Sequence, residues 1–167
     1  MSALQEQLAD RAAISDVVLG YATALDQRDW PFLRSLCADV IGVDYSSFQP
    51  GFALTLASDE WVKLMAGGFG GFDATQHISS NHVHCIEGDH AICVSYLQAS
   101  HFLAAGDITA CATVFGYYTN RLLRTQQGWK FEHITLTVKA RTGDLSVFSR
   151  AAARHAADRQ DERPAIS

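Results

Sequence analysis

Apolar side chains in the first third of the chain recur at the spacing of a helix with one buried face. The stripe ends next to Asp26 and comprises Ile14, Val17, Val18, Tyr21 and Leu25. These positions fall three or four residues apart, so they lie on one side of an α-helix. Ser2 and Gln5 have the spacing of a capping box, in which each side chain satisfies a backbone group at the helix start. The pattern therefore predicts a long first helix that ends near Asp26.

Two shorter helices are expected after the first. Asp29 is a favourable N-cap residue, and Pro31 fits the first turn of the helix that would follow it. A third helix is predicted to begin at Ser58, and Gly67 and Gly68 are expected to end it.

Beyond these glycines the hydrophobic period changes to two, which is typical of strands. Four strands are predicted at residues 75–86, 90–104, 108–124 and 129–139. Short polar turns with glycine join them at residues 87–89, 105–107 and 126–128. A short early strand at residues 41–48 and a last helix at residues 145–155 complete the expected elements. Helices followed by a meander of long strands predict the α+β class, with a mostly antiparallel sheet curled over helices.

The length fits one domain. A chain of 167 residues leaves little room for a second core, so we expect a single domain at residues 1–157. Residues 158–167 are polar and are expected to form a flexible tail. The formal charge of −5 argues against nucleic acid as a partner, because phosphate binding needs a basic surface. No apolar run is long enough to cross a bilayer, so a membrane is not expected as a partner.

The cysteines and the N-terminus suggest a reducing compartment. Cys37, Cys85, Cys93 and Cys111 form no Cys-x-x-Cys pair, and a chain of this length does not need disulfides. The N-terminal residues lack the basic and apolar stretches of a signal peptide. We therefore expect a cytoplasmic protein with reduced thiols.

An aspartate and a histidine stand out as candidates for proton transfer. Strand alternation puts Thr75, His77, Ser79 and Asn81 on one face, and Asp26 lies where the first helix ends. A carboxylate that holds one imidazole nitrogen as N–H raises the basicity of the other nitrogen. The alternative is structural: Asp26 as a turn residue and His77 as a hydrogen-bonded strand residue.

A second pair of histidines has the spacing of a strand-borne metal site. His82 and His84 are two residues apart, so they share a face. Alternation along the strand puts that face opposite the one that carries His77. A surface or interface role is favoured over metal binding for this pair, and no metal is expected at the active site.

Four segments of the chain form a recognisable series: residues 21–30 (YATALDQRDW), 43–48 (VDYSSF), 75–77 (TQH) and 128–131 (GWKF). They resemble the scytalone dehydratase family, part of the SnoaL-like group in the nuclear transport factor two-like superfamily. Their order and spacing are similar to the family pattern over residues 13–148. The resemblance implies a cone-shaped α+β barrel, with N-terminal helices in the concavity of a strongly bent, mixed but mostly antiparallel sheet.

The resemblance also implies roles for four residues. Asp26 and His77 match the family's aspartate and catalytic histidine, Tyr45 matches a tyrosine that activates the substrate carbonyl, and His101 matches the second pocket histidine. The implied enzyme is a cofactor-independent lyase that dehydrates a small cyclic or polycyclic hydroxy-carbonyl compound. Further residues are expected to contact the substrate: Tyr21, Phe48, Phe52, Trp61, Asn81, Tyr117, Tyr118, Arg141 and Phe148.

The sequence departs from the family pattern at two places. Leu25 stands where the family has a second activating tyrosine, and residues 116–120 read GYYTN where the family has a small hydroxyl and an amide. These departures argue against scytalone itself and are closer to bacterial relatives, among them a dehydrochlorinase and bile-acid dehydratases. A cyclase or isomerase of the SnoaL-like group and a non-catalytic scaffold subunit are the alternatives. The resemblance implies a homo-oligomer, with a trimer favoured over a dimer.

Overall fold

Helices and short strands come first along the chain, and long strands follow. The computed structural model describes residues 2–105 and 108–161. Its helices are α1 (Ala3–Gln27), α2 (Trp30–Ser35), α3 (Ser58–Phe69) and α4 (Ser146–Asp161). Its strands are β1 (Cys37–Asp44), β2 (Ala53–Ala57), β3 (Ala74–Glu87), β4 (His90–Ala105), β5 (Ile108–Thr125) and β6 (Gly128–Gly143). None of the helices in these residues has the length and apolar character needed to span a membrane.

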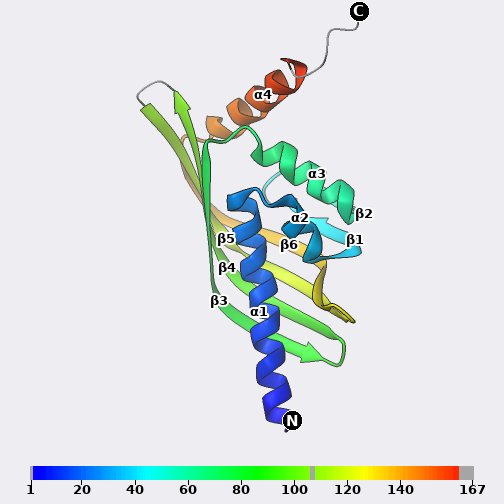
Figure 1. Cartoon of the computed structure of the whole chain (residues 1–167). Coiled ribbons are helices and arrows are strands. Elements are labelled where there is room, and N and C mark those ends of the chain that lie inside the picture. Colours follow the sequence, from blue (N-terminus) through cyan, green and yellow to red (C-terminus); the bar gives the residue numbers. More distant parts are fainter. Residues whose placement is uncertain (1, 106–107, 162–167) are drawn as a thin grey trace, which may run out of the picture.

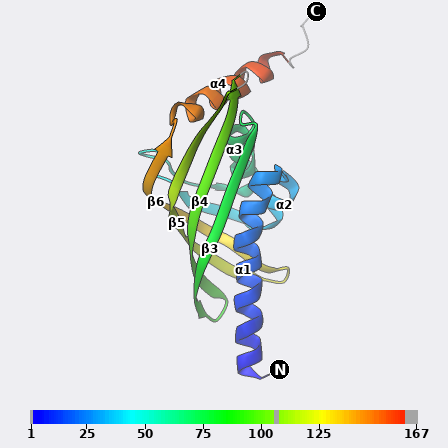
Figure 2. The ribbon, with the colours of Figure 1, turned by 90° about the vertical axis from the view of Figure 1, so that its left-hand side faces the viewer.

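The six strands form one sheet in the order β2-β1-β6-β5-β4-β3. All neighbours are antiparallel except β1 and β6, which pair in parallel. Along the chain, α3 connects β2 at one edge of the sheet to β3 at the other. The sheet curves around α1 and stays open along its two edges, β2 and β3 (Figures 1 and 2). The predicted α+β class and the mixed, mostly antiparallel sheet are confirmed.

Irregularities in the strand pairing bend the sheet. The register shifts between Ser80 and Val83 on β3, and again where Lys139 of β6 is the extra residue opposite Phe115 and Gly116 of β5. The shift on β3 contains Asn81, whose φ of 54° is left-handed, a conformation that asparagine tolerates better than most residues. An extra residue on one strand kinks that strand and increases its local twist. The bulge on β3 also changes which side chains face inward beyond it.

Helix α1 lies along the concave face of the sheet (Figure 1). Its predicted stripe is buried at Ile14, Val18, Tyr21 and Leu25. The predicted capping box at Ser2 is also present, with hydrogen bonds in both directions to Gln5. Burial of the stripe places the last turn of α1 against the start of β3.

Several element boundaries differ from those expected. Helix α3 continues through Gly67 and Gly68 to Phe69, because Trp61, Met65 and Phe69 pack against the core at helical spacing. The early strand stops at Asp44, and the chain then turns, so residues 45–48 are not extended. Strand β2 was not predicted.

The last helix extends further than expected. Helix α4 continues to Asp161, so residues 158–161 are helical rather than part of a flexible tail. Residues 106–107 of an expected turn and residues 162–167 of the expected tail lie outside the described residues.

Gly71 offers a test of how α4 is held. A Cβ atom at Gly71 would collide with the backbone carbonyl of Ala151 on α4, whereas a Cβ at Gly67 would meet only His155 at 3.9 Å. We expect Gly71→Ala to lower the free energy of unfolding by about 1–3 kcal/mol, since backbone has to move. Gly67→Ala should instead raise it by about 0.5–1 kcal/mol, because alanine favours a helix. Urea unfolding of both variants checks this, and equal effects would contradict the close docking of α4.

Candidate active site

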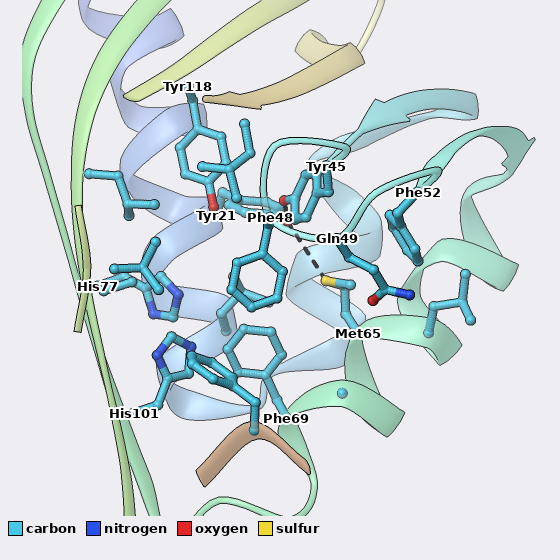
Figure 3. Close-up of a pocket in the computed structure, with 18 of the residues that line it drawn as sticks. Tyr21, Tyr45, Phe48, Gln49, Phe52, Met65, Phe69, His77, His101 and Tyr118 are labelled. Carbon is cyan, nitrogen blue, oxygen red and sulfur yellow. Dashed lines mark hydrogen bonds between the residues drawn. The ribbon is translucent and has the colours of Figure 1, made fainter. Parts of the chain in front are cut away.

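A cavity of about 230 Å³ opens between the concave sheet and the helices α1, α3 and α4 (Figure 3). Most of its lining is apolar or aromatic, as in pockets that take small organic ligands. The lining residues are Tyr21, Leu25, Tyr45, Phe48, Gln49, Phe52, Leu64, Met65, Gly68, Phe69, Phe72, His77, Leu97, Ala99, His101, Val114, Tyr118, Leu136 and Phe148. Few polar groups enter this surface, so each one is a candidate for chemistry.

Asp26 and His77 are in direct contact at the junction of α1 and β3. The distance from Asp26 Oδ1 to His77 Nδ1 is 2.6 Å, and the backbone N–H of His77 donates to Oδ2 at 2.7 Å. Thr75 Oγ1 also donates to Oδ1 at 2.9 Å. The carboxylate therefore fixes the histidine ring through both its side chain and its backbone. With Nδ1 engaged, Nε2 is the ring nitrogen left for the cavity.

The environment keeps Asp26 ionised. Burial acts to raise the pKa of Asp26, but the hydrogen bonds from the His77 ring, the His77 backbone and Thr75 together lower it below its ordinary value. An ionised carboxylate can only accept hydrogen bonds, so it holds Nδ1 of His77 as the N–H. This is the arrangement that a general base needs.

His101 faces the same cavity from β4, as its alternation with Leu97 and Ala99 predicts. Its ring centroid lies 5.6 Å from that of His77, in an edge-to-face orientation. Phenylalanine rings surround it, with Phe148 at 4.9 Å and Phe72 at 5.0 Å. Burial, together with the neighbouring His77, lowers the pKa of His101 to about 4. His101 is therefore neutral near neutral pH.

Two tyrosine hydroxyls meet on another side of the cavity. Tyr45 and Tyr21 lie 2.7 Å apart at their hydroxyl oxygens, and the Tyr21 hydroxyl is 3.9 Å from the sulfur of Met65. Burial raises the pKa of Tyr45 and of Tyr21, so both stay protonated. Leu25, one helical turn beyond Tyr21, brings no hydroxyl to the cavity.

The residues expected to contact substrate fall into two groups. Tyr21, Phe48, Phe52, Tyr118 and Phe148 line the cavity as expected. The remaining four do not line it: Trp61, Asn81, Tyr117 and Arg141.

Trp61 and Arg141 instead support the wall of the cavity. Trp61 is fully buried and packs edge-to-face against Tyr45, with ring centroids 5.5 Å apart. Arg141 lies over the ring of Phe48 at 4.6 Å and donates to the backbone carbonyls of Ser47 and Phe48. Both residues therefore hold lining residues in place.

The expected placement of Asn81 and Tyr117 is wrong. Asn81 is exposed because it occupies the bulge on β3, which breaks the alternation that was expected to continue from His77. Tyr117 alternates with the inward-facing Tyr118, so it lies on the outer face, where it packs on Tyr96 at 6.4 Å.

The same bulge corrects the placement of His82 and His84. Strand alternation predicts that they face away from the side of the sheet that carries His77. The extra residue at Asn81 turns them back toward α1, where both contact the Ser15 hydroxyl at 3.0 and 2.9 Å. Alternation with a period of two cannot by itself predict which face of the sheet a side chain takes beyond a bulge.

Other residues of the site had no predicted role. Thr75 was placed on the face of His77, and a side-chain oxygen two residues before the histidine is the signal that could have indicated its bond to Asp26. Gln49 is a polar lining residue in a turn, where no periodicity marks it. Phe69 and Phe72 line the cavity beside the glycines that were expected to end α3.

Comparison with known proteins identifies the same fold. The SnoaL-like domain family matches residues 6–135. The Kfla4162 protein from Kribbella flavida is 26% identical with a TM-score of 0.79, over 88% of this chain and 99% of that chain. A protein named provisionally as a scytalone dehydratase, from Novosphingobium aromaticivorans, is 22% identical with a TM-score of 0.73, over 84% and 91%. Hexachlorocyclohexane dehydrochlorinase LinA-type3 from Novosphingobium barchaimii is 19% identical with a TM-score of 0.71, over 84% and 94%. Among curated proteins, no sequence matches.

The lowered pKa of His101 predicts a pH dependence of stability. Below about pH 6.5 the unfolded chain binds a proton here, whereas the folded chain binds it only near the pKa of about 4. Folding stability should therefore decrease as the pH falls across this window, by about 3 kcal/mol from this residue.

His101→Phe keeps an aromatic ring among Phe72 and Phe148 and removes the titration. Urea unfolding at several pH values should show a flatter decrease in the variant than in the original chain. Parallel curves for the two proteins would show that His101 titrates normally in the folded state.

Proposed function

The chain belongs to the SnoaL-like domain family, and on this premise we propose that it is a lyase that dehydrates a small cyclic or polycyclic hydroxy-carbonyl compound by β-elimination. The observation that carries the proposal is the 2.6 Å contact between Asp26 and Nδ1 of His77 at the wall of an apolar cavity. It supplies an oriented base where a ring-shaped substrate would bind.

His77 acts as the base. Its Nε2 removes a proton from the carbon next to the substrate carbonyl, and the electrons of that C–H bond move toward the carbonyl oxygen. The carboxylate of Asp26 stabilises the imidazolium that forms, because it already accepts the N–H of Nδ1. The apolar surroundings exclude water and strengthen this interaction.

Tyr45 stabilises the oxygen on which charge develops. Tyr45 can donate to the substrate oxygen when the Tyr21 hydroxyl donates to Tyr45 rather than to the sulfur of Met65. Their raised pKa values keep both hydroxyls as donors throughout the reaction. Donors placed where negative charge develops often provide the largest single contribution to such catalysis.

The proton then returns to the leaving group. As the carbon–carbon double bond forms, the hydroxyl on the adjacent carbon departs, takes the proton from the His77 imidazolium and leaves as water. His101 is neutral, since its pKa is about 4, so it orients the departing hydroxyl by a hydrogen bond rather than as the acid. Proton removal and hydroxyl loss therefore occur on one face of the substrate.

The comparisons support this reaction class. The names of two similar structures, a dehydratase and a dehydrochlorinase, both describe an elimination, of water and of hydrogen chloride. The two reactions share the removal of a proton by a base and differ in the leaving group. We extend to this chain only the shared part, with hydroxyl as the leaving group.

Kinetics of three variants test the proposal. His77→Ala should lower kcat by about 10²–10⁴, the usual contribution of a general base. Asp26→Asn should lower kcat by nearly as much as His77→Ala, because an amide N–H favours the wrong imidazole tautomer. Tyr45→Phe keeps the ring and should cost about 10²–10³, since it deletes one donor to the developing charge. His90→Ala, at an exposed position of β4, is the control and should leave kcat unchanged.

The assay follows a panel of cyclic β-hydroxy ketones through the ultraviolet absorption of the conjugated ketone that dehydration produces. Circular dichroism establishes that each variant is folded. Full activity in folded His77→Ala would refute the proposed base. Uptake of solvent deuterium without loss of water would instead identify an isomerase or cyclase that uses the same base.

A further inference from the structure

A second group of histidines lies beneath α1, outside the cavity described above. His82 and His84 project from β3 beyond the bulge, and Cys93 projects from β4, directly opposite His84 in the register. Each of the three offers one nitrogen or sulfur atom, and these atoms lie within 4.8 Å of one another. Cys93 is fully buried and the two histidines are half-buried.

Hydrogen bonds within the group leave one imidazole nitrogen without a partner among the described residues. The Ser15 hydroxyl lies between His82 Nδ1 and His84 Nε2, and Ser79 contacts His82 Nε2 at 3.0 Å. Ser15 has one proton, so it donates to one ring and accepts from the other. His84 Nδ1 is buried and has no hydrogen-bond partner among the described residues. A buried polar atom of this kind is costly unless something binds it.

The types of residue in this group indicate which class of cation it could bind. Imidazole nitrogen and thiolate sulfur are ligands of zinc and similar soft cations, and no carboxylate belongs to the group. Burial lowers the pKa of His82 and of His84, so both rings are neutral near neutral pH, as metal ligation requires.

We propose that His82, His84 and Cys93 form a binding site for a divalent cation of the zinc class. Ligands of tetrahedral zinc lie about 3.3–3.8 Å apart, so side-chain movements of about 1 Å close the site. Burial raises the pKa of the Cys93 thiol to about 11. The positive charge of a bound cation opposes this effect, so Cys93 loses its proton to solvent when the cation binds. The Ser15 hydroxyl or a water molecule takes the fourth position.

The site would cross-link two strands and hold α1. Its ligands come from β3 and β4, and Ser15 on α1 contacts both histidine rings. The reaction proposed for Asp26 and His77 does not use these residues, so the site is structural rather than catalytic. A cation that binds only the folded chain stabilises it, and the stabilisation grows with the logarithm of the ratio of cation concentration to Kd once that ratio is large.

Cobalt(II) and zinc(II) added to chelator-treated full-length protein test the proposal. Cobalt bound to a thiolate absorbs in the near ultraviolet, and a tetrahedral site gives intense visible bands. The original chain should bind one cobalt ion with both signatures, and zinc should displace it and raise Tm. Cys93→Ala should lose the thiolate band. It should also weaken binding by about tenfold or more, because loss of even a residue that only supports a ligand costs about 10–100-fold in affinity. Cys85→Ala combined with His90→Ala, which removes an exposed thiol and an exposed imidazole, is the matched control and should behave as the original chain.

Two outcomes would overturn the site: a folded original chain without the thiolate band, or a Cys93→Ala variant that keeps it. If Cys93→Ala does not fold, X-ray absorption of the zinc-loaded control variant decides the question. A coordination shell with one sulfur and histidine nitrogens supports the site, and a shell without sulfur refutes it.

Discussion

The carboxylate of Asp26 joins the end of α1 to the edge strand β3, and the geometry of the candidate site depends on this contact. Three donors, from Thr75 Oγ1 and from the backbone and ring of His77, converge on its two oxygens. A half-buried carboxylate is costly without such partners, and with them its pKa is lowered. The same bonds that stabilise the charge therefore set the orientation of the imidazole.

The rest of the cavity is arranged around this contact by packing. The curved sheet brings β4 beside β3, so His101 lies next to His77, and α4 brings Phe148 against His101. Burial lowers the pKa of His101 and raises that of Tyr45, so the surrounding polar groups are neutral. A single ionised carboxylate next to a histidine, in neutral and largely apolar surroundings, is well suited to moving one proton at a time.

Much of the fold was predictable because local patterns and the final structure agree. The helical stripe on α1 and the alternation along β4 and β5 directly indicate which face of each element is buried. The helix end and the strand alternation made Asp26 and His77 candidates for a pair. Only the family resemblance favoured the pair over structural roles, since spacing alone cannot bring a helix end to a strand in space. The predictions failed where tertiary structure overrides the local pattern. The bulge at Asn81 reverses the face of His82 and His84, and no periodicity signals an inserted residue.

Two other elements depended on neighbours that a sequence does not show. The glycines of α3 stay helical because the packing of Trp61, Met65 and Phe69 on the core outweighs the weak helix propensity of glycine. Strand β2 is largely exposed, so it is held by pairing with β1 rather than by burial of its own side chains. Helix α3 contributes Met65 and Phe69 to the cavity lining, and Phe52 of the lining directly precedes β2.

The most direct test of the account is the tautomer of His77, that is, which of its two ring nitrogens carries the proton in the neutral form of the ring, measured by nitrogen-15 NMR. The contact with Asp26 predicts that the proton resides on Nδ1, with a proton resonance shifted downfield by the short hydrogen bond, and that Nε2 carries a free lone pair. Asp26→Asn should abolish the shifted resonance. A proton on Nε2 in the original chain, or a spectrum that Asp26→Asn leaves unchanged, would contradict the role of Asp26 as the group that prepares His77 to act as a base.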